Sequence, residues 1–162
     1  MHHQKGFSLI ETLVVLAISA LLCCFSISFF QDYFAKQQAR WYLLGIKQLM
    51  IHATQYASLC HQTMIICPIG KHDYCGKNWA KGQVLFIAPD TSFPFYYGSG
   101  IIREHKNTRK HHRISLKSFP SSKYLRFDGQ NPSNHNNGRF IYSLANHSLT
   151  LQFKQNGYMS LA

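Results

Sequence analysis

Residues 5–30 read KGFSLIETLVVLAISALLCCFSISFF, a Lys-Gly junction followed by an apolar run whose one charged residue is Glu11. The twenty residues from Thr12 to Gln31 are uncharged, and a helix of that length reaches about 30 Å, the thickness of a bilayer's hydrocarbon core. Because Gly6 precedes the run, cleavage there leaves the apolar segment on the mature chain, unlike cleavage of a secretory signal. The sequence therefore predicts a transmembrane helix over residues 7–31.

Glu11 is unusual in such a helix, because a carboxylate costs about 2.5–3.5 kcal/mol at the centre of a bilayer. Cleavage after Gly6 creates a partner for it, the new α-amino group of Phe7, which lies one helical turn away or on a neighbouring subunit. The plainer alternative is that Glu11 lies near the membrane interface and reaches toward water.

The segment from Lys5 to Leu13 resembles the class III signal of type IV pilins and type II secretion pseudopilins. The resemblance implies that prepilin peptidase cuts between Gly6 and Phe7, that Phe7 is N-methylated, and that Glu11 directs subunit registration. It also implies a cleaved leader over residues 1–6 and assembly with other pilin or pseudopilin subunits through the N-terminal helix. Lys5, with no further basic residue until Lys36, predicts a single pass through the inner membrane with the C-terminal domain in the periplasm.

The helix is expected to continue beyond the membrane as an amphipathic segment over residues 32–60. No proline precedes Pro68, and small or apolar residues recur at alternating steps of three and four. These residues are Leu43, Ile46, Met50, Ala53 and Ala57. Such a stripe packs against a globular domain in pilin-like subunits, and the alternative is a separate helix on the membrane surface.

Residues 61–162 change to short β-like runs separated by turn residues. The fold class predicted is therefore α+β, with the long N-terminal helix packed on a C-terminal antiparallel sheet or small sandwich. Turns are expected at Asn146-His147 and Asn156-Gly157, and a surface loop over Asn131 to Gly138. The candidate strands are Thr63 to Cys67, Gln83 to Ala88, Arg113 to Phe119, Lys123 to Phe127, Arg139 to Leu144, Ser148 to Lys154 and Tyr158 to Leu161.

A second resemblance concerns the cysteines. The residues Ile66-Cys67-Pro68, Cys75-Gly76, Trp79 and Gly82 resemble a pattern of the FimT/GspH group of minor pilins and pseudopilins, which often bridges the two cysteines. The short loop and the periplasmic compartment also favour a Cys67–Cys75 disulfide. This pairing leaves Cys60 free, while a Cys60–Cys67 bond and three buried thiols are the alternatives.

The chain has 17 Lys and Arg residues against 6 Asp and Glu, a formal net charge of +11. Six basic residues lie close together: Arg103, Lys106, Arg109, Lys110, Arg113 and Lys117. Such a patch can contact nucleic acid or an acidic partner subunit, and the plainer alternative is a solvated loop before a strand. Some FimT-type minor pilins bind DNA through a C-terminal Gly-Arg-X-Arg element, but the corresponding Gly157-Tyr158-Met159-Ser160 contains no arginine.

The histidines do not predict a metal site. His105, His111 and His112 lack carboxylates or cysteines at the spacing of a dedicated site, and we interpret them as loop residues. The sequence also contains no phosphate-binding loop, no paired carboxylates outside the membrane segment and no convincing nucleophile triad, so no cofactor and no enzyme activity are expected.

Three functional hypotheses follow. The first is a structural minor pilin or pseudopilin of a type IV pilus or a type II secretion system. The second is the same scaffold acting as a DNA-binding minor pilin in natural transformation. The third is a membrane-anchored periplasmic binding protein that never polymerises. The first is preferred because the leader, the glutamate and the β-rich domain agree with one another.

Overall fold

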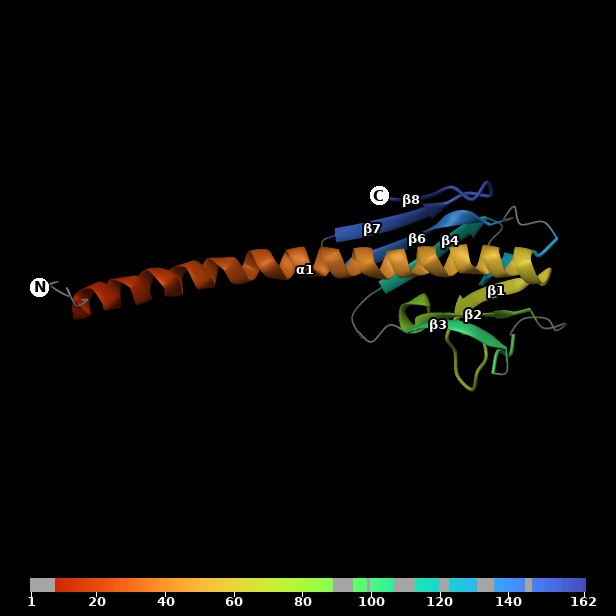
Figure 1. The fold of residues 1–162 in the computed structure, drawn as a ribbon, viewed down its shortest axis with the longest axis horizontal. Coiled ribbons are helices and arrows are strands. Elements are labelled where there is room, and N and C mark those ends of the chain that lie inside the picture. The colour runs from red at the N-terminus through yellow and green to blue at the C-terminus, as the bar shows by residue number, and fades with distance from the viewer. Residues whose placement is uncertain are drawn as a thin grey trace, which may run out of the picture. The chain divides into compact units, whose positions relative to one another are not determined.

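The computed structural model describes residues 8–88, 95–98, 100–106, 113–119, 123–130, 136–144 and 147–162. The chain divides into two compact units, residues 1–37 and residues 38–162. One helix, α1 (Leu9–Cys60), supplies all the described secondary structure of the first unit and continues into the second (Figure 1). The strands all belong to the second unit.

Helix α1 is 52 residues long. Its sequence contains no proline and a single glycine, Gly45, so the backbone hydrogen bonds are not interrupted. The helix ends at Cys60, and His61 then adopts a left-handed conformation with φ 53°, the backbone geometry that commonly closes a helix. The predicted stripe is confirmed, because all five of its residues from Leu43 to Ala57 are buried.

The first sheet has the strand order β3-β2-β1-β5, with antiparallel neighbours throughout. Its central strand β1 is buried on both faces, which explains the unbroken apolar run from Met64 to Cys67. The strands are β1 (Met64–Pro68), β2 (Gly82–Ile87), β3 (Ile101–Lys106) and β5 (Leu125–Phe127), and a short 3-10 helix η1 (Trp79–Lys81) leads into β2.

The second sheet has the order β4-β6-β7-β8 and is also antiparallel. Its strands are β4 (Arg113–Phe119), β6 (Asn137–Leu144), β7 (His147–Phe153) and β8 (Met159–Leu161). The expected turn at Asn156-Gly157 joins β7 to β8, and Gly157 has φ 80°, a conformation that favours glycine.

One hydrophobic core unites the second part of α1 with both sheets. Leu43 and Ile46 of the helix belong to the same cluster as Leu85 of the first sheet and Phe140 of the second. A separate cluster covers the other face of the first sheet and includes Phe86, Phe95 and Tyr97. The predicted α+β fold is thus confirmed, and of its two alternatives, one sheet or a small sandwich, the structure has two sheets that share a core with the helix.

Three sequence predictions need correction. Strand β3 was missed, because an exposed edge strand tolerates the charged residues of its sequence IIREHK, which resembles a loop. The 3-10 helix η1 was also missed. The predicted loop over residues 131–138 is wrong at its end, because Asn137 and Gly138 pair in β6, and residues 131–135 lie outside the described residues. Of the other expected turn, Asn146-His147, Asn146 lies outside the described residues, while His147 begins β7 and pairs with Leu144.

Candidate functional site

The first turn of α1 carries Glu11, one residue of the expected assembly motif. Its backbone N–H donates to the Ser8 carbonyl at 3.0 Å, and the Thr12 hydroxyl donates to the Leu9 carbonyl at 2.8 Å. The Glu11 side chain is exposed, beside the helix end whose free amide groups favour a negative charge. Gly6 and Phe7 lie outside the described residues, so the cleavage and methylation sites remain predictions.

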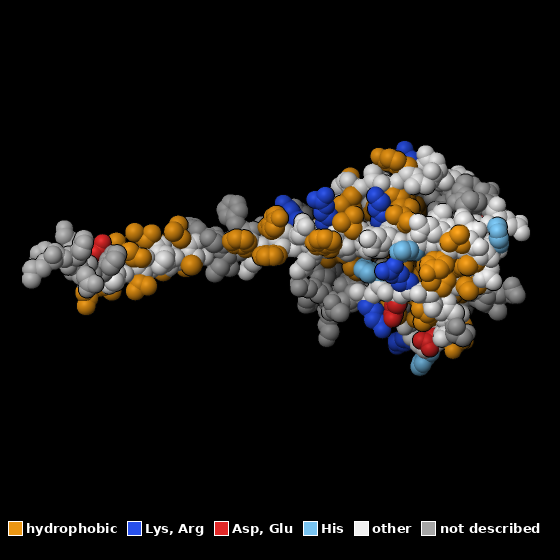
Figure 2. Space-filling model, in the orientation of Figure 1, with side chains coloured by type: hydrophobic (Ala, Val, Ile, Leu, Met, Phe, Trp, Pro, Cys, Tyr) orange, Lys and Arg blue, Asp and Glu red, His pale blue; other side chains and the backbone are white. Residues whose placement is uncertain are grey.

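The first unit exposes many large apolar side chains, and Figure 2 shows those on one face of its helix. Leu9 is 78 % exposed and Leu16 is 65 % exposed. A soluble helix buries its apolar stripe, so side chains arranged in this way indicate that another molecule covers them. The others are Ile10, Leu13, Val14, Val15, Ile18, Leu21, Leu22, Phe30, Tyr33 and Phe34.

A membrane-spanning helix was expected over residues 7–31. Over the ranges that the structure describes, no helical stretch combines the length and the apolar character needed to cross a bilayer.

Cys67 and Cys75 form a disulfide with a Cα–Cα distance of 5.6 Å, and both are buried. The Cys75 N–H donates to the Phe95 carbonyl at 2.9 Å, and the Gly76 N–H donates to the Pro68 carbonyl at 2.7 Å. The bond therefore fixes the loop after β1 against the second hydrophobic cluster. Cys60, at the end of α1, is free and exposed.

The predicted basic patch does not lie on a single loop before a strand, as its plainer alternative supposed. Arg103 and Lys106 lie on β3, whereas Arg113 and Lys117 lie on β4, and these are edge strands of different sheets. Lys106 pairs with Glu104 at 3.0 Å, an exposed ion pair that contributes little to stability. Arg109 and Lys110 lie outside the described residues.

The interpretation of His105 as a loop residue was wrong. It lies in β3, half-buried, and its Nδ1 is 3.2 Å from Oε1 of Gln83. Because an amide oxygen can only accept, Nδ1 carries the proton. Burial lowers the pKa of His105, and the nearby charge of Arg103 lowers it further. His111 and His112 lie outside the described residues. Among the residues that the structure describes, no three His, Cys, Asp or Glu side chains gather as metal ligands.

A partly buried polar network surrounds this histidine. The Gln83 amide donates to the Tyr42 hydroxyl at 2.7 Å and to the Trp79 carbonyl at 2.8 Å, and the Tyr42 and His105 rings lie 4.8 Å apart. Burial raises the pKa of Tyr42 to about 12, so its hydroxyl remains protonated at physiological pH. The network connects α1, η1, β2 and β3.

Two further contacts hold β3 against α1. Arg103 donates from Nη1 to His52 Nε2 at 2.6 Å. A Cβ atom at Gly45 would lie 2.5 Å from His105 Nε2, so any larger residue at this position would force the histidine ring to shift. Sequence reasoning missed this network, although two signals were present: Gln83 inside an apolar strand and Gly45 inside a helix.

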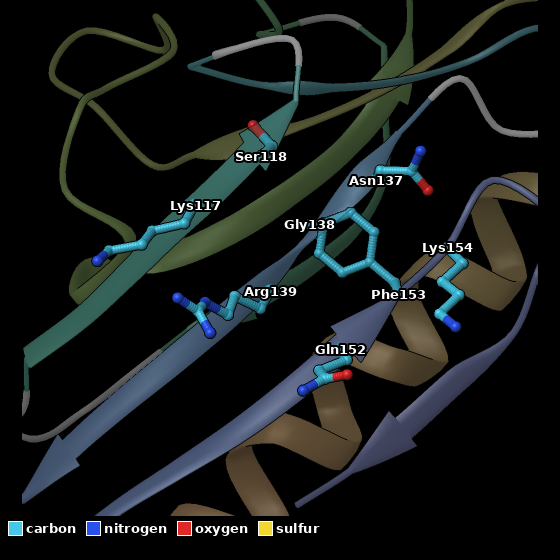
Figure 3. A pocket seen from close by; sticks show the side chains of 8 residues that line it. All are labelled: Lys117, Ser118, Asn137, Gly138, Arg139, Gln152, Phe153 and Lys154. Carbon is cyan, nitrogen blue, oxygen red and sulfur yellow. The ribbon is translucent and has the colours of Figure 1, made fainter.

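An open hollow on the second sheet contains cations that the sequence analysis did not single out (Figure 3). Lys117 of β4, Arg139 of β6 and Lys154 just after β7 line it, and only Lys117 was predicted as a contact residue. The sequence signal that could have revealed Arg139 is the alternation of side chains along a strand. Arg139 precedes the core residue Phe140 and therefore points to the opposite face of the sheet. The other lining residues are Ser118, Asn137, Gly138, Gln152 and Phe153.

Comparisons with known proteins agree with the N-terminal motif and the fold. Residues 1–23 match the prokaryotic N-terminal methylation motif. The fold is similar to crystal structures of the type IV minor pilin FimU of Pseudomonas aeruginosa PAO1. The P21 crystal form gives a TM-score of 0.55 at 15 % identity, covering 80 % of this chain and 92 % of FimU.

The P65 crystal form of FimU gives a TM-score of 0.51 at 15 % identity, covering 76 % of this chain and 91 % of FimU. No curated protein sequence matches the chain. At this identity the structural likeness establishes the fold, while the methylation motif establishes the type of N-terminus. The chain therefore joins a prokaryotic N-terminal methylation motif to a fold similar to that of a type IV minor pilin.

Proposed function

We propose that this chain is a structural minor pilin or pseudopilin, processed by prepilin peptidase and incorporated into a filament. One observation carries the proposal: three features occur together in one chain. These are a methylation motif, a helix with exposed apolar side chains, and a β-rich domain with a hydrophobic core. The proposed organisation is a leader over residues 1–6, a membrane segment over 7–31, an amphipathic continuation over 32–60 and a periplasmic domain over 61–162.

The first unit is proposed to exchange one apolar environment for another. Before assembly the inner membrane covers its exposed leucines and valines, and afterwards the helices of neighbouring subunits cover them. Burying one such side chain contributes about 1.5–3 kcal/mol. A helix that exposes apolar side chains on all sides suits both environments, because each surrounds it completely.

Glu11 is proposed to select the register of assembly. In the filament its carboxylate pairs with the methylated amino group of Phe7 on a neighbouring subunit. In an apolar surrounding an unpaired charge is costly, so only the register that brings the two charges together is stable. This role explains a lone carboxylate among exposed apolar side chains.

The subfamily is also part of the proposal. The cysteine pattern is similar to that of the FimT/GspH group, and the Cys67–Cys75 disulfide supports a periplasmic location because disulfides persist there.

A DNA-binding minor pilin is the second candidate, favoured by the net charge of +11. It is ranked lower because the hairpin from Gly157 to Ser160 contains no arginine. A non-polymerising periplasmic binding protein is the third candidate. It is ranked last because this function does not explain the methylation motif.

The experiment that tests the proposal places a photo-cross-linking amino acid at Leu16 in living cells. The expected product is a covalent adduct with another protein that carries the same N-terminal motif, identified by mass spectrometry. Glu11→Ala is expected to reduce this adduct strongly, whereas Thr12→Ala, a neighbouring exposed position, is expected to leave it unchanged. Adducts to lipid alone in actively assembling cells contradict the proposal.

A further inference from the structure

The outward face of the second sheet is built from alternate residues of its strands. Leu116, Phe140 and Leu151 lie directly opposite one another; Phe140 and Leu151 belong to the core cluster, and Leu116 packs against it. The next cross-strand row is therefore on the other face: Lys117 is paired with Arg139, and Arg139 with Gln152. All three side chains of this row are exposed.

This arrangement places two cations directly opposite each other. Like charges in directly opposed positions of an antiparallel pair destabilise a sheet. The strands β4, β6, β7 and β8 contain no aspartate or glutamate, so no carboxylate within the sheet offsets the repulsion between Lys117 and Arg139. The face gains stability when an external anion lies between the two side chains.

Lys154 adds a third cation to the same hollow (Figure 3). Its Nζ lies 5.7 Å from the centre of the Tyr158 ring, a contact that orients the ammonium group. Asn137 and Gln152 contribute amide donors beside the three charges. The hollow has a volume of about 660 Å³ and is open to solvent, so it can receive side chains that project from another surface.

We propose that this face binds the carboxylates of an acidic surface on a different subunit of the assembly. The inference rests on the proposed function and names the kind of neighbour that this subunit accepts. A net charge of +11 makes two copies of the chain repel each other, so a carboxylate-rich neighbour is favoured over a second copy. An arginine guanidinium binds a carboxylate through two parallel hydrogen bonds, which fixes the orientation of the neighbour.

A protein partner fits the hollow better than single-stranded nucleic acid does. Proteins that bind single strands offer exposed aromatic rings on which the bases stack. The aromatic residue that lines this hollow is Phe153, and it is only 3 % exposed because it packs in the core. The nearby Tyr158 ring is 56 % exposed, but it lies against the Lys154 ammonium group. What remains accessible in the lining of the hollow is a set of charged and amide groups suited to isolated carboxylates.

The test uses the full-length chain in uncharged detergent micelles and a fluorescently labelled poly-glutamate peptide as the probe. The double variant Lys117→Gln/Arg139→Gln removes the opposed cations. The matched control Lys71→Gln/Lys77→Gln removes the same charge from two exposed positions in the loop after β1. Fluorescence anisotropy measures the dissociation constant of each, with duplex DNA as a competitor.

The expected result is binding about tenfold weaker for the Lys117/Arg139 variant, the loss of two exposed ion pairs, with the control close to the wild type. Equal weakening in both variants, or none in either, overturns the proposal. Tighter binding of duplex DNA than of the peptide, dependent on Lys117 and Arg139, overturns it in favour of a nucleic-acid surface.

The two proposals fail separately. If the mature chain is cleaved and methylated but does not bind the peptide through Lys117 and Arg139, the acidic-neighbour inference is wrong while the proposed function stands. If the chain binds the peptide but retains its leader in cells, the proposed function is wrong and the assignment of the partner as a neighbouring subunit falls with it.

Discussion

The two parts of α1 carry similar apolar side chains in opposite surroundings. In the first unit Leu13 and Leu16 are 57 % and 65 % exposed, whereas in the second unit Leu43 and Ile46 have no exposed surface. The second part packs on two sheets of its own chain, so its apolar stripe stabilises the fold of this subunit. The first part leaves its apolar side chains exposed, and we propose that they serve insertion and assembly instead.

The two parts of α1 also differ in how apolar residues are placed along their sequences. Between residues 9 and 22 apolar residues occupy every side of the helix, but between 43 and 57 they form a stripe at steps of three and four. A stripe needs one packing partner, whereas an all-round apolar surface needs to be enclosed. The difference teaches that one continuous helix can serve two separate tasks, and that substitutions in its two parts have different consequences.

The largest expected effect comes from matched truncations in the two parts. Leu43→Ala should lower the free energy of unfolding of the β-rich unit by about 2–5 kcal/mol, because it leaves a cavity in the core. Leu16→Ala removes the same atoms from an exposed position and should change that free energy by less than about 0.5 kcal/mol. Denaturant unfolding in micelles, followed by near-UV circular dichroism, measures both, and equal losses break the comparison.

The next effect concerns the disulfide. Replacing Cys67 and Cys75 by serine should reduce the free energy of unfolding of the second unit by about 2–3 kcal/mol, because the bond restricts the unfolded chain. Cys60→Ser is the control, since Cys60 is free and exposed. Thermal unfolding with and without a reducing agent provides the measurement. A reductant effect that persists in the double serine variant would show that the bridge is not its cause.

A smaller effect tests how closely β3 approaches α1. Gly45→Ala should destabilise the wild type by about 1–3 kcal/mol, because the new methyl group displaces the His105 ring. In a His105→Ala background the same substitution should stabilise the protein by up to about 1 kcal/mol, because alanine favours a helix more than glycine does. The sign change in this double-mutant cycle is the prediction, and the same sign in both backgrounds contradicts the contact.

The smallest effect is a dependence of stability on pH. Because burial and then Arg103 lower the pKa of His105 below its usual value, the unfolded chain binds the proton more readily than the folded one. Stability is therefore full above about pH 6.5 and decreases as the pH falls from there through the lowered pKa. Exposure of the ring to solvent keeps the change well under about 1 kcal/mol. His105→Gln should flatten the stability profile between pH 7 and pH 5, and an unchanged slope excludes His105 as its source.

The sequence predicted those elements whose pattern reports burial. The stripe from Leu43 to Ala57 predicted the core face of the helix correctly, because burial imposes a period on the side chains. The edge strand β3 was missed because solvent on its exposed side permits Arg103, Glu104 and Lys106, and charged residues are typical of loops.

The sites were harder to predict than the fold. Glu11 was singled out because its motif is local in sequence, and its role in assembly stays a prediction. The network of Tyr42, Gln83 and His105 instead joins residues that only the tertiary fold brings together. The hollow required knowledge of the register, since Lys117 and Arg139 become neighbours only when β4 pairs with β6. Cross-strand proximity of this kind is not encoded in the spacing of residues along one chain segment.

The central claim is that the apolar helix belongs to a processed subunit, and the intact mass of the membrane-extracted protein tests it most directly. The account predicts a mass that lacks residues 1–6 and carries one added methyl group on Phe7, with Gly6→Val retaining the full unmethylated chain. A wild-type protein that retains Met1 and has an unmodified N-terminus, in cells that process other proteins with this motif, would contradict the account.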